Sequence, residues 1–394
     1  MIEGSKTDAA TRKLRMGMVG GGPGAFIGDV HRKAARLDGQ VEIIGGAFDI
    51  DPAKSHEMGR ILNLDPSRVH DNFEKMIEAE LALPEEERID FVSITTPNNW
   101  HFPIAKAFLE AGFNVICEKP MTMNVEEAVE LKKVVDSSGK VFALLHNYTG
   151  YPMVKHARWM VQQGKLGKVQ KIVVEYPQDW LLKRIELEGQ QQASWRTDPK
   201  QAGAGGCLGD IGTHAENLAH YITGLYIDEL CADLTAFAEG RVLDDDVNVL
   251  LRYENGAKGV LHSSQISTGE ENNLNIRVWG TEGALQWFQE NPNYLYYFQQ
   301  GEPVQILRRS NGYICEAGQR TTRIPPGHPE AFLEAFANIY MNAIDTMRAK
   351  MTGKQPTELE LDFPNVDDGL VGMQFIETVV ASSKSDVKWE KFHK

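Results

Sequence analysis

The stretch GGGPGAFIG, residues 20–28, follows an apolar run and holds five glycines in nine residues. Glycine lets a backbone turn tightly and approach a phosphate, whose charge is met by the N–H groups and dipole of the helix that follows. The loop is about two residues longer than G-x-G-x-x-G, so its third glycine is undecided. The predicted phosphate-binding residues are Gly20, Gly22, Gly24, Phe26 and Ile27, with Gly28 as the alternative third glycine.

The chain around this loop alternates short apolar runs with helical patterns as far as residue 147. Runs such as VEIIGGAF, DFVSITT and FNVICE are typical of strands buried on both faces. This alternation predicts an α/β fold with a doubly wound parallel sheet, a Rossmann domain, over residues 14–147. The polar residues 1–13 are predicted to be a disordered lead-in.

Beyond residue 147 the pattern changes, and strand-like runs dominate after Leu225. One of these runs is DLTAFAEGRV (233–242), and a helix is expected around Asp210–Thr223. An Asn255-Gly256 pair indicates a hairpin turn. We expect residues 148–394 to form an α+β domain with a large, mostly antiparallel open sheet. A sheet of this kind often mediates assembly, so a homodimer or homotetramer is predicted.

Composition excludes several classes of function. The formal net charge of −14 over 394 residues argues against a nucleic-acid or anionic-membrane partner, which would need a basic face. No apolar run approaches the roughly 18 residues of a membrane span, and no apolar secretory segment is present. The four cysteines are widely spaced and form no C-x-x-C pair, which favours reduced thiols in the cytoplasm and no zinc site.

An acidic residue follows the glycine loop at the end of the next predicted strand. Asp49 lies 29 residues after Gly20, somewhat farther than the usual spacing of about 20. A carboxylate there accepts hydrogen bonds from the ribose hydroxyls of a dinucleotide and repels the 2′-phosphate of NADP. Because Ile50 and Asp51 supply no arginine, the sequence favours NAD over NADP as cofactor.

Three further stretches carry polar side chains, namely TTPNNWH (95–101), CEKPMT (117–122) and GGCLGDIGTHAENLAHYITG (205–224). The first two follow predicted strands, at the sheet edge where doubly wound folds bind ligands. Through the pair EKP and GDIGTH, the sequence resembles the Gfo/Idh/MocA family of glucose–fructose oxidoreductase and inositol dehydrogenase relatives. The resemblance runs from Arg15 onward and includes HPEAFLEAFANIY (328–340) and DDGLVGMQFIETVVASS (367–383).

This resemblance implies a catalytic set of Lys119, Asp210 and His214. Lys119 corresponds to the lysine beside the nicotinamide and the substrate hydroxyl, Asp210 to the acid and His214 to the general base. Residues four apart on a helix share a face, so Asp210 and His214 can line one pocket. Imidazole titrates near neutrality and can take a hydroxyl proton, while an ammonium can stabilise alkoxide character.

The resemblance also implies the remaining cofactor and substrate contacts. His101 is expected near the nicotinamide, with a helix N-cap or packing role as the alternative. The family often has Asn-Tyr-Arg where this chain has Asn147-Tyr148-Thr149, so a phosphorylated or acidic substrate is less expected. Residues 177–199 are expected to cover the substrate, and the alternative to substrate contact for Trp195-Arg196 is packing of this covering segment onto the domain. The predicted cofactor residues here are Thr96, Pro97, Asn98, His101, Glu118 and Lys119, and the predicted substrate residues are Asn147, Trp180, Arg184, Trp195, Arg196, Asp210 and His214.

The sequence thus predicts an NAD-dependent oxidoreductase that oxidises a secondary hydroxyl of a neutral sugar, glycoside or cyclitol to a ketone. Two alternatives stay open. One is a glycosidase that uses NAD as a transient oxidant, and the other is a non-catalytic protein that senses a sugar or nucleotide. The presence of Lys119, Asp210 and His214 counts against the sensor, which needs no proton-transfer groups. No metal ligand set is predicted.

Overall fold

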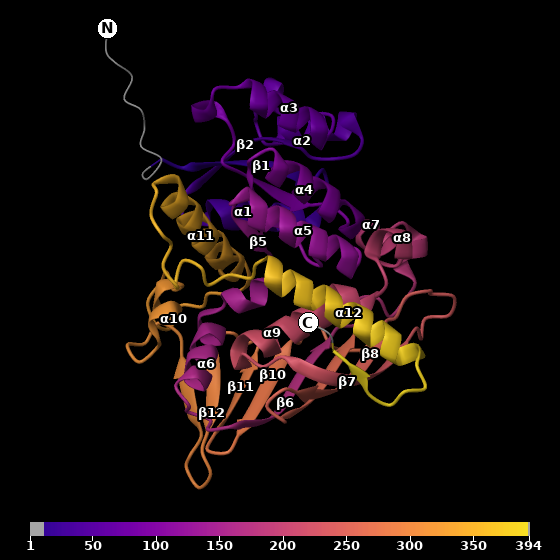
Figure 1. Ribbon diagram of the computed structural model, residues 1–394, viewed down its shortest axis with the longest axis vertical. Helices are drawn as coiled ribbons and strands as arrows, with labels where there is room; N and C mark the ends of the chain where they lie inside the picture. The colour runs from indigo at the N-terminus through magenta and orange to yellow at the C-terminus, as the bar shows by residue number, and fades with distance from the viewer. Residues whose placement is uncertain (1–11, 393–394) are drawn as a thin grey trace.

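The computed structural model describes residues 12–392, so residues 1–11 of the predicted lead-in lie outside the described part (Figure 1). A five-stranded parallel sheet forms the first layer, with strand order β2-β1-β3-β4-β5. It confirms the predicted Rossmann arrangement. Its strands are β1 (Leu14–Gly20), β2 (Val41–Ala47), β3 (Phe91–Thr95), β4 (Asn114–Cys117) and β5 (Phe142–Leu144). Its helices are α1 (Phe26–Leu37), α2 (Pro52–Ile61), α3 (Phe73–Ala82), α4 (His101–Glu110) and α5 (Val125–Ser138).

A nine-stranded sheet forms the second layer and confirms the predicted large, mostly antiparallel sheet. The strand order is β13-β12-β11-β10-β6-β9-β8-β7-β14, and only β6 and β9 pair in parallel. The strands are β6 (Val169–Pro177), β7 (Ile227–Thr235), β8 (Asp246–Tyr253), β9 (Lys258–Ser264), β10 (Asn275–Gly280), β11 (Ala284–Phe288), β12 (Tyr294–Phe298), β13 (Gln305–Arg308) and β14 (Glu390–Lys391).

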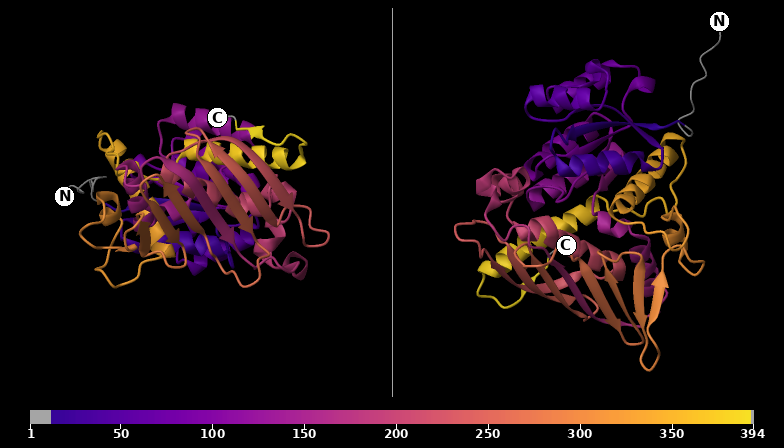
Figure 2. Two further views of the ribbon diagram at one scale, coloured as in Figure 1. Left: turned by 90° about the horizontal axis from the view of Figure 1, so that it is seen from below. Right: turned by 180° about the vertical axis from the view of Figure 1, so that it is seen from behind.

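Helices cover one face of this sheet and leave the other open (Figure 2). The open face carries partly exposed apolar side chains such as Leu250, Phe298 and Ile306. Assembly through this face stays a prediction. The helices of this half are α6 (Pro152–Gln162), α7 (Gln191–Arg196), α8 (Pro199–Ala202), α9 (Thr213–Thr223), α10 (Glu316–Arg320), α11 (Phe332–Met351) and α12 (Val366–Lys384).

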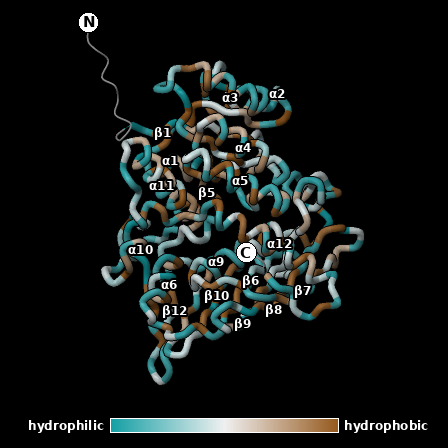
Figure 3. The backbone as a smooth tube through the Cα atoms, viewed as in Figure 1, coloured by the Kyte–Doolittle hydropathy of each residue, from teal (hydrophilic) through white to brown (hydrophobic). Residues whose placement is uncertain are grey.

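The last two long helices join the two layers. Helix α11 packs on α1, and α12 packs on both α5 and β7 (Figure 1). At the α1–α11 contact, the Tyr340 hydroxyl lies 2.7 Å from His31 Nδ1. The C-terminal helices therefore return to the first layer, and the domain boundary at residue 147 stays a prediction. Apolar residues follow the strands of both layers, whereas helices that face solvent, such as α2, are more hydrophilic (Figure 3).

Two expected elements differ in detail. The predicted strand through DLTAFAEGRV ends at Thr235, because the buried Asp245 carboxylate accepts hydrogen bonds from the backbone N–H groups of Phe237 and Ala238 and folds the chain into a loop. The helix predicted around Asp210–Thr223 begins with a π-helical turn at Leu208–Gly212 and becomes regular at α9. Turns of this type often occur at functional sites.

Candidate active site

The glycine loop joins β1 to α1, and the geometry explains why glycine stands at several of its positions. Gly20 has a φ of +85°, which side chains rarely adopt. A Cβ on Gly28 would lie 2.4 Å from the Cα of Gly21, so only glycine lets α1 pack this closely against the loop. A Cβ on Gly24 would meet only Gln191 Oε1, at 3.7 Å. The structure therefore gives the helix-packing role of a third glycine to Gly28, while Gly24, with a φ of +79°, makes a turn.

A cavity of about 730 Å³ opens beside this loop, and we call it the glycine-loop cavity. Asp49 lies in its wall, and a Cβ on Gly22 would lie 2.9 Å from Asp49 Oδ2. The Thr96 hydroxyl is buried and has no hydrogen-bond partner within residues 12–392, so it is available to a ligand. The predicted cofactor residues that line the cavity are Gly20, Gly22, Ile27, Asp49, Thr96 and Pro97.

The other predicted cofactor residues of the first domain do not line this cavity, and three of them have structural partners instead. His101 is fully buried, with Nδ1 2.7 Å from the Pro120 carbonyl and Nε2 3.0 Å from that of Thr96, so its geometry matches the packing alternative. Asn98 donates to the Ala202 carbonyl at 2.9 Å. Glu118 Oε1 lies 2.7 Å from His31 Nε2. The residues outside the cavity lining are Gly24, Phe26 (61 % exposed), Asn98, His101, Glu118 and Lys119.

Lys119 and Asp210 meet where the two layers face each other. Lys119 follows β4 at the carboxyl edge of the parallel sheet, and Asp210 lies in the π-helical turn before α9. The lysine Nζ is 3.0 Å from Asp210 Oδ1 and 2.6 Å from the Asp210 carbonyl oxygen. Arg196 Nε donates to the same Oδ1 at 3.2 Å, and Gln265 Nε2 donates to Oδ2 at 2.8 Å.

These neighbours determine the charge of Asp210. Burial alone would raise the pKa of its carboxyl group, but the charges of Lys119 and Arg196 outweigh burial and lower the pKa well below its ordinary value. Asp210 is therefore ionised at neutral pH. An ammonium group has three N–H donors, and Asp210 accepts two of those of Lys119, which leaves one for a further oxygen atom.

His214 lies one helical turn beyond Asp210, on α9, and is almost fully buried. Burial, the nearby Lys119 charge and His146 lower the pKa of His214 well below 6.5, although Asp210 opposes this. Its Nδ1 is 3.3 Å from the Nδ1 of His146, and its ring packs edge-on against Tyr148. Among the described residues, no hydrogen bond to His214 Nε2 is found. The imidazole is therefore neutral at pH 7, with Nε2 free.

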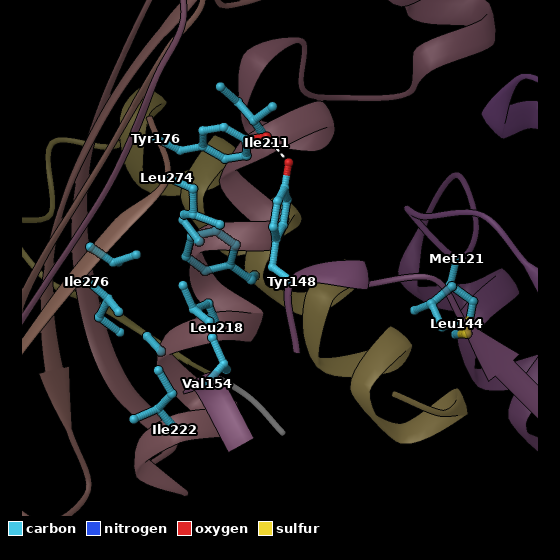
Figure 4. Packing of buried hydrophobic residues seen from close by; sticks show 14 of the residues in the cluster. Met121, Leu144, Tyr148, Val154, Tyr176, Ile211, Leu218, Ile222, Leu274 and Ile276 are labelled. Carbon is cyan, nitrogen blue, oxygen red and sulfur yellow. Dashed lines mark hydrogen bonds between the residues drawn. The ribbon is translucent and has the colours of Figure 1, made fainter. Parts of the chain in front are cut away.

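Two neighbours of His214, namely His146 and Tyr148, are not among the predicted site residues. His146 directly precedes the predicted Asn147, and burial with the Lys119 charge lowers the pKa of His146 to about 3. The Tyr148 hydroxyl is hydrogen-bonded to that of Tyr176 (Figure 4), which donates to Asn272 Oδ1 at 2.7 Å. The run LHNY at the end of the fifth strand was a local signal for His146 and Tyr148. Asn272 and Gln265 had no such signal.

The covering segment brings two of its predicted residues to the site. Trp195 lines the glycine-loop cavity, and the Arg196 guanidinium lies 4.1 Å from the centre of the Trp195 ring and 6.0 Å from that of Trp180. Arg184 has other partners, because it donates to Glu186 at 3.2 Å and to the Glu239 carbonyl at 2.9 Å. Its predicted substrate contact is therefore not supported by the geometry.

Two amide atoms near the site lack partners. Asn147 is 2 % exposed, and neither its Nδ2 nor the buried Oε1 of Gln178 has a hydrogen-bond partner in the part of the chain that the structure describes. Such groups are costly to bury unless a ligand or water pairs with them. The side chains of residues 12–392 bring together no group of three His, Cys, Asp or Glu residues that could hold a metal ion. In the same range, no helix has both the length and the apolar character to cross a membrane.

Comparison with known proteins assigns the family. Residues 14–146 match the model of the oxidoreductase family with an NAD-binding Rossmann fold, and residues 154–286 match that of the GFO/IDH/MocA C-terminal domain. The chain belongs to the Gfo/Idh/MocA family of oxidoreductases. This Gfo/Idh/MocA chain is also 33 % identical over 385 residues to an uncharacterized oxidoreductase of Bacillus subtilis. The aligned region covers 97 % of this chain and 98 % of the relative.

Two crystal structures of an inositol dehydrogenase homolog from Azotobacter vinelandii are similar to this Gfo/Idh/MocA chain. One, complexed with NAD+, is 35 % identical with a TM-score of 0.92 and covers 100 % of both chains. The other, complexed with NADH and myo-inositol, is 32 % identical with a TM-score of 0.90 and covers 98 % of this chain and 100 % of that one. The cofactor is NAD, and the glycine-loop cavity fits it: Gly22 lies against Asp49, and Thr96 offers an unpaired hydroxyl.

Proposed function

We propose that this protein oxidises a secondary hydroxyl of a neutral cyclitol, sugar or glycoside to a ketone. The observation that supports this most strongly is the pair formed by a neutral, buried histidine and a lysine with one free donor. His214 keeps Nε2 free of hydrogen bonds to the described residues, and Asp210 holds Lys119 at 3.0 Å. Both belong to a site at the carboxyl edge of the NAD-binding sheet, where doubly wound folds bind ligands.

In this proposal each side chain has a defined role. Bound NAD supplies the hydride acceptor. His214 takes the proton of the substrate hydroxyl at Nε2, which it can do because its lowered pKa keeps it neutral. Lys119 donates its remaining N–H to the same substrate oxygen and stabilises the negative charge that develops there. Asp210 holds the Lys119 ammonium group in place and keeps a negative charge near His214.

The polar atoms around this centre support a neutral polyol substrate. The unpaired amide atoms of Asn147 and Gln178 suit hydroxyl groups, which both donate and accept hydrogen bonds. Thr149 occupies the position where the family often has arginine, so a basic contact for a phosphate is missing there. The Azotobacter relative binds myo-inositol, which makes cyclitols the first class to examine.

A substrate panel with a matched pair of variants tests the proposal. We expect reduced-cofactor absorbance to rise with NAD and one or more inositols, monosaccharides or glycosides. His214→Ala should lower turnover by about 10²–10⁴-fold and leave NAD affinity within a few-fold. His220→Ala on the same helix, whose Nδ1 contacts the Leu225 carbonyl, is the control and should keep its turnover. Unchanged turnover in His214→Ala would exclude the histidine as base.

The same assays separate the two alternatives. Release of nitrophenol from an aryl glycoside without net NADH would indicate the glycosidase that uses transient oxidation. Binding of sugar and NAD with no turnover on any substrate would indicate the sensor. For the dehydrogenase, the acid limb of kcat/KM should lie below pH 6.5, because a base with a lowered pKa stays active until the pH falls through that value.

A further inference from the structure

Arg32 is a buried cation that forms no ion pair with any described residue. It lies on α1 with 4 % exposure, and no carboxylate among the described residues forms an ion pair with it. Its Nη1 donates to the Gly21 carbonyl at 2.7 Å and lies 3.6 Å from Met18 Sδ. Burial lowers the pKa of Arg32, because its charged form is poorly solvated there, and the charge of Asp29 on the same helix opposes this only in part. A charge in such a place costs stability unless something compensates for it.

The cavity on the other side of Gly21 has the opposite imbalance. Its ionisable lining residues are three acids, Asp49, Asp71 and Glu74, and one base, Lys75. Lys75 already pairs with Asp71 at 2.6 Å. The pyrophosphate of NAD carries negative charge into this acidic wall, where the start of α1 offers only partial positive charges from its backbone. Among the described residues, the lining therefore contains no unpaired side-chain cation for the pyrophosphate.

We propose that Arg32 is a cofactor-affinity residue that acts from beneath the glycine loop. Its guanidinium is oriented by the hydrogen bond to the Gly21 carbonyl and supplies the positive charge that the lining lacks. Gly21 lies between the two, since it both lines the cavity and accepts the hydrogen bond from Arg32. The bound pyrophosphate then compensates the buried charge. This inference depends on NAD binding alone, and it holds whatever substrate the enzyme oxidises.

Calorimetric titration of the purified protein with NAD, ADP-ribose and adenosine tests the charge. Arg32→Met should lower the affinity for NAD and for ADP-ribose by about tenfold or more, since a charge-assisted attraction in a partly buried site is lost. Adenosine, which has no phosphate, should bind within about twofold of the wild-type affinity. Arg32→Lys keeps the charge and should recover most of the ADP-ribose affinity. The dependence of NAD affinity on salt should be smaller in Arg32→Met.

Arg36→Met is the matched control, because Arg36 is exposed on the same helix and its loss removes the same formal charge. It should change ADP-ribose affinity by less than about twofold, since exposed charges are screened. Thermal melting gives a second readout. Without ligand, Arg32→Met should melt at or above the wild-type temperature, because an uncompensated charge is removed. Its stabilisation by NAD should be smaller.

Three results would overturn the proposal. The first is an ADP-ribose affinity of Arg32→Met equal to that of the wild type. The second is an equal loss for adenosine and ADP-ribose, which would mean that the substitution distorts the loop rather than removing a charge. The third is a ligand-free melting temperature of Arg32→Met well below the wild type, or failure to fold, because the arginine would then serve the fold rather than the cofactor.

Discussion

Asp210→Asn tests the role of a carboxylate that binds side chains from both layers. Three side chains donate to Asp210, with Lys119 and Arg196 at Oδ1 and Gln265 at Oδ2. An asparagine has one acceptor oxygen and one NH₂ group, so in either orientation at least one of these donors faces another donor. The two cations also lose their counter-ion.

The cost follows from this geometry. Removing one partner of a buried ion pair costs about 3–5 kcal/mol. The Lys119 and Arg196 side chains keep 11 % and 19 % exposure, so water screens part of the loss and we expect about 2–4 kcal/mol. The pKa of Asp210 is lowered from 3.8, so its contribution to stability is present above that pH and is lost as the pH falls through the folded-state value. The difference in the free energy of unfolding between the wild type and Asp210→Asn should therefore become smaller below about pH 3.8.

Urea unfolding at several pH values and steady-state kinetics measure both consequences. Asp210→Asn should lower kcat/KM by about 10²-fold or more, since Lys119 is no longer held beside the substrate oxygen. Asp210 raises the pKa of His214, so the variant should shift the acid limb of kcat/KM to lower pH. The control Asp179→Asn alters one exposed hydrogen bond, from the Gly269 N–H at 3.1 Å. Wild-type stability together with kcat/KM within tenfold would refute the reasoning.

Two further predictions concern the loop and a buried acid. Gly28→Ala should cost about 1–3 kcal/mol of stability and weaken NAD binding, because its Cβ would lie 2.4 Å from Gly21 Cα. Gly24→Ala should cost only about 1 kcal/mol, from backbone strain. Equal melting temperatures of the two variants would contradict this prediction. Burial and Asp368 raise the pKa of Glu216 to about 8, so its ionisation costs stability as the pH rises from 4.5 to 8. Urea unfolding should show Glu216→Gln gaining about 3–5 kcal/mol over the wild type at pH 8.5 and little at pH 4.5, and a gain independent of pH would contradict the assignment.

The first layer could be predicted from local patterns, because a strand buried on both faces is a continuous apolar run and a phosphate loop needs glycine. The mostly antiparallel type of the second sheet also followed from alternation and turns. What local patterns missed was decided by tertiary contacts. The strand predicted through Phe237 ends early because Asp245, a residue eight positions away, binds its backbone N–H. No property of the run itself shows this.

For the candidate site, the sequence likewise predicted which segments come together but not which way each side chain points. Residues 95–101 and 117–122 were placed at one sheet edge by the rule that parallel strands end together. That rule gives the edge and not the direction of each side chain. His101 and Glu118 therefore lie at the predicted edge, yet each ends in a buried hydrogen-bond pair, with Pro120 and His31 respectively. Arg184 lies in the predicted covering segment but binds Glu239.

The substrate is harder to infer than the cofactor for a physical reason. Gly20, Gly22 and Asp49 in the lining of the glycine-loop cavity are brought together by one local unit, a strand, its loop, one helix and the next strand, although Thr96 and Trp195 come from farther along the chain. The substrate side of the proposed site contains Gln178, Gln265 and Asn272, which come from separate strand ends of the second layer. It also contains Asp210, which accepts hydrogen bonds from residues 91, 14 and 55 positions away. Each such residue alone is an ordinary polar residue in a loop. In the proposed function, specificity therefore depends on the pairing of strands that are distant in sequence, and we expect substitution of these three amides to alter substrate preference more than NAD affinity.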